Sequence, residues 1–284
     1  MQRTGADIIV TLLERQGVTT IAGIPGGSNL PLYDALGQSD AIRHILCRHE
    51  QAAGFIAQGL ARVTGRPGVC LATSGPGATN LLTAVADARL DSIPLVAITG
   101  QAPLSMIGTD AFQEVDTYGM SVPVTKHNVL VRSAQELLAV IPEAFRIAAS
   151  GRPGPVWIDV PKDVQKELVT FDEWPEPGRA DPAPQADSRS LDEAARLIRN
   201  AGRPVIYAGG GIVHSGASEV LLELAERTHT PVTMTLNALG AMPYDHPLSL
   251  GMLGMHGSRW TNAVLDRADL LVVLGARFDD RATG

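Results

Sequence analysis

Apolar residues follow two spacings along this chain, one typical of amphipathic helices and one typical of buried strands. Helical spacing recurs over residues 4–16, 29–36, 50–61, 77–90, 134–149, 191–200 and 218–227. Between these segments lie short, continuous apolar runs at residues 18–22, 42–47, 68–73, 94–99, 129–131, 156–159, 204–208, 231–235 and 270–274. Helices that alternate with fully apolar strands are typical of parallel sheets covered by helices on both faces. The pattern predicts an α/β fold made of two doubly wound parallel-sheet units.

A polar segment divides the pattern in two. Residues 171–186 are rich in Pro, Asp, Glu and Gly, a composition typical of a linker. We therefore expect a first domain over residues 1–170, a linker over 171–189 and a second domain over 190–284. The chain ends in the loop after the last apolar run, and we expect it to be a fragment of a longer protein.

Composition and charge narrow the class of protein. The 284 residues suffice for two domains, and an apolar fraction of 45% permits a sizeable core. The formal net charge of −7 argues against a surface that binds nucleic acid or an anionic membrane. No uncharged stretch is long enough to span a bilayer, and no basic run with an apolar block opens the chain. We expect a soluble, cytoplasmic protein.

The cysteines and histidines indicate no metal site. Cys47 and Cys70 both fall in predicted strands, where we expect inert, buried thiols rather than a disulfide or metal ligands. No Ser-His-Asp arrangement, zinc-ligand spacing or phosphate-loop lysine motif occurs, and the histidines are scattered. We therefore expect no metal ligand in this chain.

An acidic residue, Glu50, stands where the apolar run 42–47 meets a helix. Ligands of parallel α/β sheets bind at the carboxyl ends of strands. A carboxyl group there can donate a hydrogen bond to an aminopyrimidine, provided that it is desolvated enough to stay protonated. We expect Ala52, Ala53 and Phe55 to desolvate it. The alternative is a solvated glutamate at a helix N-terminus, worth ~0.3–1 kcal/mol, and spacing alone favours that alternative.

A glycine turn, Ser74–Asn80, follows the apolar run 68–73 and precedes a helix. Backbone in such a turn can approach a flat ring, or can bind an anion at the helix N-terminus. Asn80 replaces the third glycine of a dinucleotide fingerprint, and no acidic ribose ligand stands at the expected distance. A plain tight turn remains the alternative.

In the second unit the glycine run from Gly209–Gly211 to Gly216 is also mis-spaced for the dinucleotide fingerprint, so it is a weak indication of nucleotide binding by itself.

Two further positions follow predicted strands. Phe112 and Gln113 lie in a long polar loop after the run 94–99, and loops at strand ends commonly carry function. Lys162 follows the run 156–159. Packing alone would explain Phe112, and an isolated surface lysine is the better interpretation of Lys162 from its position.

Several motifs stand in a fixed order along the chain: Ile24–Ser28, Arg48–Phe55, Ser74–Asn80, Ile107–Glu114, Lys126–Asn128, Gly151–Pro155 and Gly275–Arg281. Each of these motifs alone would be weak. Their order and identity together resemble the thiamine-diphosphate enzymes, and specifically the large, catalytic subunits of acetolactate synthase. The resemblance covers nearly the whole chain.

The resemblance implies a role for each matching residue of the first unit. Glu50 is implied to be the acid that binds the pyrimidine of thiamine diphosphate and so helps the thiazolium carbon to lose its proton. The other implied contacts of this cofactor are Gly27, Pro76, Asn80 and Gln113. The implied substrate-binding residues are Ser28, Phe112, Lys162 and Arg281. Members of the family often carry Ala at the position of Ser28, so the fit of substrate or inhibitor there is open.

The second unit is implied to bind a flavin. The implied FAD contacts are Arg152, Gly209, Gly210, Gly211, Thr235, Leu236, Leu253, Met255, His256, Gly275, Ala276, Arg277 and Asp279. Met255 and Arg281 are also implied to border the substrate channel. A guanidinium group there can bind the carboxylate of a 2-oxo acid bidentately.

Mg²⁺ is implied as a third cofactor, held in a C-terminal domain by a Gly-Asp-Gly motif that this chain lacks. We therefore expect this chain to be inactive alone. The resemblance also implies homodimers or homotetramers of full-length chains and a small regulatory subunit.

The implied function is acetolactate synthesis in branched-chain amino-acid biosynthesis. Pyruvate would be decarboxylated and condensed with a second pyruvate or with 2-oxobutyrate, and FAD would be structural because the net reaction is not redox. One alternative is a pyruvate oxidase, in which the flavin is redox-active. Another is a non-catalytic nucleotide-binding module of two α/β units. Residues 275–281 and Phe112–Gln113 favour the synthase.

Overall fold

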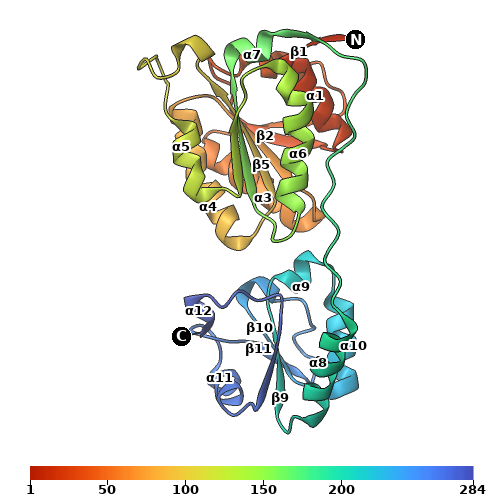
Figure 1. The fold of residues 1–284 in the computed structure, drawn as a ribbon. Helices are drawn as coiled ribbons and strands as arrows, with labels where there is room; N and C mark the ends of the chain where they lie inside the picture. The colour runs from red at the N-terminus through yellow and green to blue at the C-terminus, as the bar shows by residue number, and fades with distance from the viewer. Residues whose placement is uncertain (284) are drawn as a thin grey trace. The chain divides into compact units, whose positions relative to one another are not determined.

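The computed structural model describes residues 1–283, which form two compact α/β units (Figure 1). The first unit is Met1–Ala183, and the second begins at Pro184. Residues 171–187 contain no helix or strand. Their first part nevertheless packs on the first unit, because a Cβ atom at Gly178 would lie only 1.8 Å from the carbonyl oxygen of Pro142. The expected linker therefore belongs in part to the first unit.

The sheet of the first unit is parallel throughout, as the apolar runs predicted. The order of its strands is β3 (Arg43–Leu46), β2 (Thr20–Gly23), β4 (Gly68–Ala72), β5 (Leu95–Gln101), β7 (Pro155–Pro161) and β6 (His127–Leu130). Every residue of β4, β5 and β7 is buried, because helices cover both faces of these strands. The predicted α/β class is confirmed.

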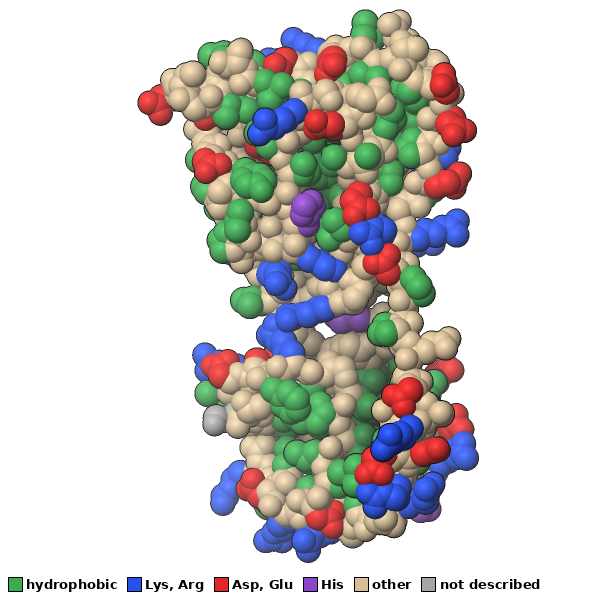
Figure 2. All heavy atoms as spheres, viewed as in Figure 1, with side chains coloured by type: hydrophobic (Ala, Val, Ile, Leu, Met, Phe, Trp, Pro, Cys, Tyr) green, Lys and Arg blue, Asp and Glu red, His purple; other side chains and the backbone are tan. Residues whose placement is uncertain are grey.

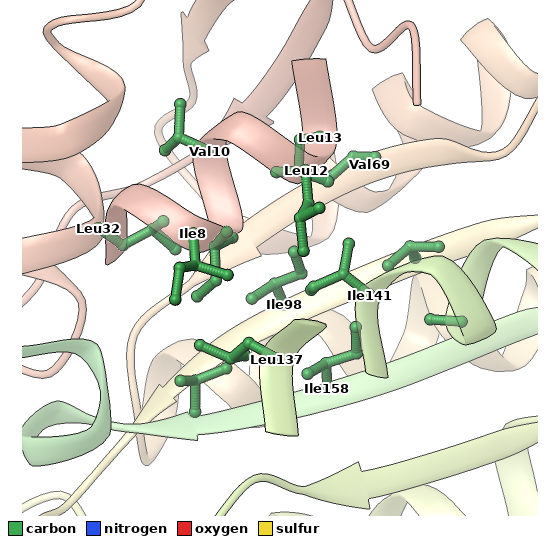
Figure 3. Packing of buried hydrophobic residues seen from close by; sticks show 14 of the residues in the cluster. Ile8, Val10, Leu12, Leu13, Leu32, Val69, Ile98, Leu137, Ile141 and Ile158 are labelled. Atoms are coloured by element: carbon green, nitrogen blue, oxygen red, sulfur yellow. The ribbon is translucent and has the colours of Figure 1, made fainter. Parts of the chain in front are cut away.

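One face of this sheet carries an aliphatic core under α1 (Gly5–Arg15), α2 (Leu30–Leu36) and α6 (Leu137–Ala149). Figure 3 shows side chains of α1 and α6 converging on Ile98 and Ile158 of the sheet. Branched aliphatic side chains fill the space between helix and sheet here. This core holds the strands in register and so fixes where their carboxyl ends lie.

The opposite face is rich in alanine and glycine, under α3 (Glu50–Thr64) and α4 (Pro76–Asp91). These two helices approach so closely that a Cβ atom added at Gly54 would lie 2.5 Å from the Cβ atom of Ala84. The side-chain amide of Gln58 donates a hydrogen bond to the carbonyl oxygen of Ala84 at 2.7 Å. Small residues therefore set the distance between the two helices that carry Glu50 and the glycine turn.

Four short elements of the first unit were not predicted. They are β1 (Gln2–Thr4), β8 (Leu168–Thr170), α5 (Thr117–Ser121) and α7 (Lys162–Lys166). The two strands pair antiparallel with each other, separately from the main sheet. The two helices are too short to show a helical period, and the two strands lack the longer apolar runs that marked the strands of the main sheet.

The second unit is built on a four-stranded parallel sheet. Its strand order is β11 (Ser249–Met252), β10 (Val232–Met234), β9 (Pro204–Ala208) and β12 (Leu270–Leu274). Its helices are α8 (Ser188–Asn200), α9 (Gly211–His214), α10 (Ser218–Thr228), α11 (Arg259–Asp266) and α12 (Asp280–Thr283).

In the second unit the start of one predicted helix is wrong, and strand β11 and helices α9, α11 and α12 were not predicted. The helix expected over residues 191–200 begins at Ser188, because the Asp187 carboxylate caps it by accepting a hydrogen bond from Ser190 N at 2.9 Å. Strand β11 was missed. It contains Gly251, which has a positive φ of 70°, and its pairing with β10 is irregular, so the segment lacks the apolar run of the other strands.

Only one of the two cysteines behaves as predicted. Cys70 is fully buried in β4, and this burial raises the pKa of its thiol to about 12. Cys47 is half-buried and lies just beyond β3, so the prediction of a buried strand position is wrong for it. Strand β3 lies at the edge of the sheet, which leaves the residue after it partly open to solvent. Both thiols are free.

Charges of both signs are interspersed with apolar side chains on the face of the molecule shown in Figure 2. Some charged residues form ion pairs within their own helix, as Arg196 and Glu193 do in α8 at 2.5 Å and Arg227 and Glu223 in α10 at 3.1 Å. Such exposed pairs contribute little to the stability of the fold, because water and salt screen their charges. Over residues 1–283, no helix has the length and apolar character needed to cross a membrane.

Candidate active site

The loops after β2 and β4 meet at the carboxyl edge of the first sheet. Strand β3 lies on one side of β2 and β4 on the other, so the chain changes direction between β2 and β4. Open α/β sheets bind ligands at such a switch point. There Ser28 N donates to Thr73 Oγ1 at 3.2 Å, and the hydroxyl groups of Ser28 and Ser74 lie 2.8 Å apart. The structure thus joins the motifs Ile24–Ser28 and Ser74–Asn80.

Glu50 is the first residue of α3 and is only 9% exposed. His49 caps the helix, with Nδ1 accepting a hydrogen bond from Gln51 N at 3.1 Å. Asn80 of α4 donates from Nδ2 to Glu50 Oε2 at 2.8 Å. Two residues thirty positions apart are therefore brought into direct contact, and the alternative of a solvated glutamate is wrong.

The residues expected to desolvate Glu50 are only partly the right ones. Ala53 is buried, but Ala52 is exposed and Phe55 is 40% exposed. Positions two and five residues along a helix lie away from the face of the first residue. The start of α4 covers the carboxyl instead, since a Cβ atom at Gly77 would lie 3.3 Å from Glu50 Oε1.

Gln113 lies against the glycine turn. Gly75 has a φ of 56°, and a Cβ atom there would come within 2.6 Å of the carbonyl oxygen of Gln113. Only glycine permits both this backbone conformation and this close approach. The neighbouring Phe112 is 88% exposed. In the part of the chain that the structure describes, its side chain is therefore not packed against Glu50.

The other predicted positions of the first unit differ in their settings. Beside Gly27 there is open space, with nothing within 4 Å of a Cβ atom placed there. Pro76 is exposed at the first turn of α4, and Lys162 is half-buried at the start of α7. Arg152 instead lies before β7, at the amino edge of the sheet, where its Nε donates to Ser92 Oγ at 2.7 Å. The structure does not bring Arg152 to the Glu50 site.

Sequence analysis missed two residues that support this site. Gln165 of α7 donates to the carbonyl oxygens of Ser28 at 2.7 Å and Val160 at 2.8 Å. Tyr33 of α2 places its hydroxyl 2.5 Å from where a Cβ atom of Gly23 would be, at the end of β2. Burial, with the nearby Cys47, Cys70 and Glu50, raises the pKa of Tyr33. No local pattern marks either residue, because each acts across a distant loop.

The second unit places two glycine loops at the switch point of its own sheet. Strand β12 lies on one side of β9 and β10 on the other. The loop after β9 holds Gly209–Gly211, and a Cβ atom at Gly209 would lie 2.4 Å from Ala276 Cα in the loop after β12. Gly211 N donates to the carbonyl oxygen of Gly275 at 3.0 Å. The glycines are thus required for these two loops to touch.

The residues of the second unit that are implied to contact flavin gather around these loops, whereas Arg152 belongs to the first unit. Arg281 donates to the sulfur of Met255 at 3.2 Å, and Arg277 Nε lies 3.4 Å from Asp279 Oδ2. Thr235 and Leu236 follow β10, the neighbouring strand, and Leu253 is buried just after β11 while His256 is exposed. Phe278 has a positive φ of 56°, and its ring lies edge-on to the ring of Tyr207, with ring centroids 5.4 Å apart.

Within the part of the chain that the structure describes, no group of three His, Cys, Asp or Glu side chains could hold a metal ion. The two sites instead offer hydrogen-bonding and glycine-lined surfaces at the switch points of parallel sheets. This arrangement is typical of α/β proteins that bind organic ligands at the carboxyl ends of their strands.

Comparison with known families agrees with this class. Residues 3–120 match the thiamine pyrophosphate enzyme N-terminal TPP binding domain, and residues 191–284 match the thiamine pyrophosphate enzyme central domain. The chain therefore belongs to the thiamine pyrophosphate enzymes.

The curated proteins that this chain resembles are named more specifically, as acetolactate synthase large subunits. The chain is 63% identical over 281 residues to the acetolactate synthase isozyme 1 large subunit of Escherichia coli, covering 99% of this chain and 50% of that protein. It is 51% identical over 285 residues to the acetolactate synthase large subunit of Corynebacterium glutamicum (99% and 45%). It is 50% identical over 285 residues to a probable acetolactate synthase large subunit of Methanocaldococcus jannaschii (99% and 48%). The chain spans about half the length of the curated relatives it matches.

Proposed function

We propose that this chain supplies the pyrimidine-binding and central domains of an acetolactate synthase large subunit. The observation that carries the proposal is the buried Glu50 carboxyl, hydrogen-bonded by Asn80 at the switch point of the first sheet. The enzyme would decarboxylate pyruvate and join the remaining two-carbon unit to a second pyruvate or to 2-oxobutyrate, in branched-chain amino-acid biosynthesis. The identity of 63% with a relative of that name supports a synthase over a pyruvate oxidase.

The residues of the first unit suit thiamine diphosphate. The cofactor, when bound, supplies the carbon nucleophile for a 2-oxo acid and takes up the electron pair that decarboxylation releases. Glu50 would donate a hydrogen bond to a pyrimidine nitrogen from a side chain that is largely shielded from water. Asn80 occupies Oε2 of the carboxyl, which leaves Oε1, beside Gly77, for the ligand. The open space beside Gly27 would let the reacting atoms come close to the backbone there.

The other members of the proposed site follow from the same resemblance. Ser28, Phe112, Lys162 and Arg281 would contact the 2-oxo acid, and Gln113 and Pro76 would line the pyrimidine pocket. FAD would lie on the glycine loops of the second unit, where the buried hydroxyl of Tyr207 has no hydrogen-bond partner among residues 1–283. Mg²⁺ would bind the diphosphate through a further domain. We also propose a cytoplasmic enzyme that forms homodimers or homotetramers and binds a small regulatory subunit.

A chimera tests the proposal directly. Residues 1–284 would replace the matching half of the Escherichia coli isozyme 1 large subunit, because the chain covers 50% of that protein. The chimera is expected to form acetolactate from pyruvate only when thiamine diphosphate and Mg²⁺ are present, measured by colorimetric assay of the product. A folded chimera that binds the cofactor but forms no acetolactate would contradict the proposal.

Flavin binding gives a second prediction. In the chimera, Arg277→Ala is expected to reduce bound flavin several-fold while thiamine diphosphate binding changes little, because a charge-assisted contact is lost. Flavin absorbance after gel filtration measures the retention. Arg196→Ala is the matched control, since Arg196, like Arg277, is an exposed arginine paired with a nearby carboxylate. Equal loss of both cofactors would show unfolding instead.

A further inference from the structure

A buried carboxyl group, Asp159, lies in β7 and has no part in the contacts described above. Its side chain is 2% exposed, and it accepts hydrogen bonds from Thr99 Oγ1 at 2.7 Å and from Gln101 Nε2 at 2.9 Å. Trp157 Nε1 donates to the same Thr99 hydroxyl oxygen at 2.8 Å. Because Thr99 and Asp159 are paired in register, this network joins β5 and β7 on one face of the sheet.

Gln101 connects the network to the loop that carries Phe112 and Gln113. The same Nε2 atom that bonds Asp159 also donates to the carbonyl oxygen of Val115 at 3.0 Å. The other end of the amide, Oε1, accepts a hydrogen bond from Ala102 N at 2.9 Å. Val115 directly follows the motif 107–114, so the oriented amide of Gln101 holds the end of this loop.

Other carboxylates hold different parts of the same loop. Asp163 accepts hydrogen bonds from Leu104 N at 3.1 and 3.2 Å, at the loop's start. Glu114 accepts from Gly108 N at 2.8 Å and so closes the loop on itself. Neither contact ties residues 107–116 to the sheet, whereas the Gln101–Val115 bond does.

The stability of the sheet does not explain a carboxyl group at this position. Replacing both partners of a buried hydrogen bond by apolar groups of the same shape can leave the stability nearly unchanged. Burial raises the pKa of Asp159 to about 7, although hydrogen bonds from Thr99, Gln101 and Thr117 oppose the shift. Asp116, at the start of α5, raises it further. The folded state therefore favours the neutral form of Asp159. This contribution to stability is fully present at a pH below the ordinary pKa of 3.8, and it is lost as the pH rises through about 7, where Asp159 ionises.

We propose that Asp159 is a positioning residue, which orients Gln101 so that residues 107–116 are held over the glycine turn at Gly75. The importance of Phe112 and Gln113 in catalysis rests on the proposed function, but the positioning of their loop does not. Removing the carboxylate should free the loop without loosening the sheet. Above pH 7, where Asp159 is ionised, the strength of a hydrogen bond to a charged group sets the expected size, about 10- to 100-fold in local opening.

Hydrogen exchange of the 284-residue chain, followed by mass spectrometry, tests the positioning without any cofactor. Asp159→Asn is expected to raise exchange in peptides over residues 107–116 by about tenfold or more, with β5 and β7 unchanged. Gln101→Met, which removes the link to Val115, should have the same effect. Asp163→Asn is the matched control, because it should loosen residues 104–106 alone. Unchanged exchange over 107–116, or an equal rise throughout the sheet, would overturn the proposal.

A spectroscopic readout separates positioning from general destabilisation. In a Trp174→Phe, Trp260→Phe background, the fluorescence of Trp157 should titrate near pH 7, because Thr99 links its ring to Asp159. Asp159→Asn should abolish that titration while the fluorescence spectrum stays that of a buried tryptophan. A titration that survives in Asp159→Asn would contradict the assignment. Failure of the chimera to form acetolactate would leave both of these results standing and would count only against the proposed function.

Discussion

Glu50→Gln is expected to lower acetolactate formation by the chimera by about 10²–10⁴-fold, the range for loss of an acid–base group. Glutamine has nearly the same shape and can accept the hydrogen bond from Asn80, so the fold should be retained. It cannot hold the proton that the pyrimidine nitrogen requires. The direct measurement is hydrogen exchange at the thiazolium carbon of bound thiamine diphosphate, followed by NMR.

Two further variants sharpen this test. Glu143→Gln is the matched control, because Glu143 is an exposed glutamate of α6 paired with Arg146, and it should not affect exchange. Asn80→Leu should give a smaller loss than Glu50→Gln, because it leaves the carboxyl in place but without its partner. Unchanged thiazolium exchange in Glu50→Gln would remove Glu50 from the proposed role.

Gly54→Val is expected to destabilise the first unit by about 3 kcal/mol, the upper end of the range for an overpacked core. A Cβ atom at Gly54 would lie 2.5 Å from that of Ala84, so α3 and α4 must move apart. The gain from removing glycine from a helix is only ~1 kcal/mol, so the clash dominates. Urea unfolding in a Trp260→Phe background measures the change, since Trp157 and Trp174 both belong to the first unit.

A reciprocal pair of substitutions identifies the cause. Gly54→Ala alone should destabilise the first unit by about 1–2 kcal/mol. Ala84→Gly alone should also destabilise it, because it places a glycine in α4. The double variant should be more stable than the sum of the two single effects predicts, because it restores the spacing between the helices. Additive effects would mean that the contact between Gly54 and Ala84 does not set the position of α3.

The candidate site could be predicted from the sequence because its elements are local. Glu50 stands where an apolar run meets a helix, and the glycine turn stands between a strand and a helix. Each of these boundaries is visible in the chain itself, and parallel sheets bring such boundaries to one edge. The contact between Glu50 and Asn80, however, depends on the packing of α3 on α4 and has no local pattern.

The errors have a common cause. Ala52 and Phe55 were expected to desolvate Glu50 because they are near it in sequence, but the helix turns them to another face. Cys47 was expected to be buried because it continues an apolar run, but its strand lies at the sheet edge. Strand β11 was missed because Gly251 interrupts the apolar pattern. Sequence position gives neither the face of a helix nor the neighbours of a strand.

The sequence by itself determined the α/β class, the two units and the motifs shared with thiamine pyrophosphate enzymes. Those features depend on the spacing of apolar residues and on short runs of identical residues, which are properties of the chain. The tertiary structure decided which side chains meet. The burial of Glu50 under α4, the hold of Gln165 on Ser28 and the network of Asp159 all join residues from separate elements. Such contacts are set by strand order, register and the spacing of helices, which form only when the whole sheet is assembled.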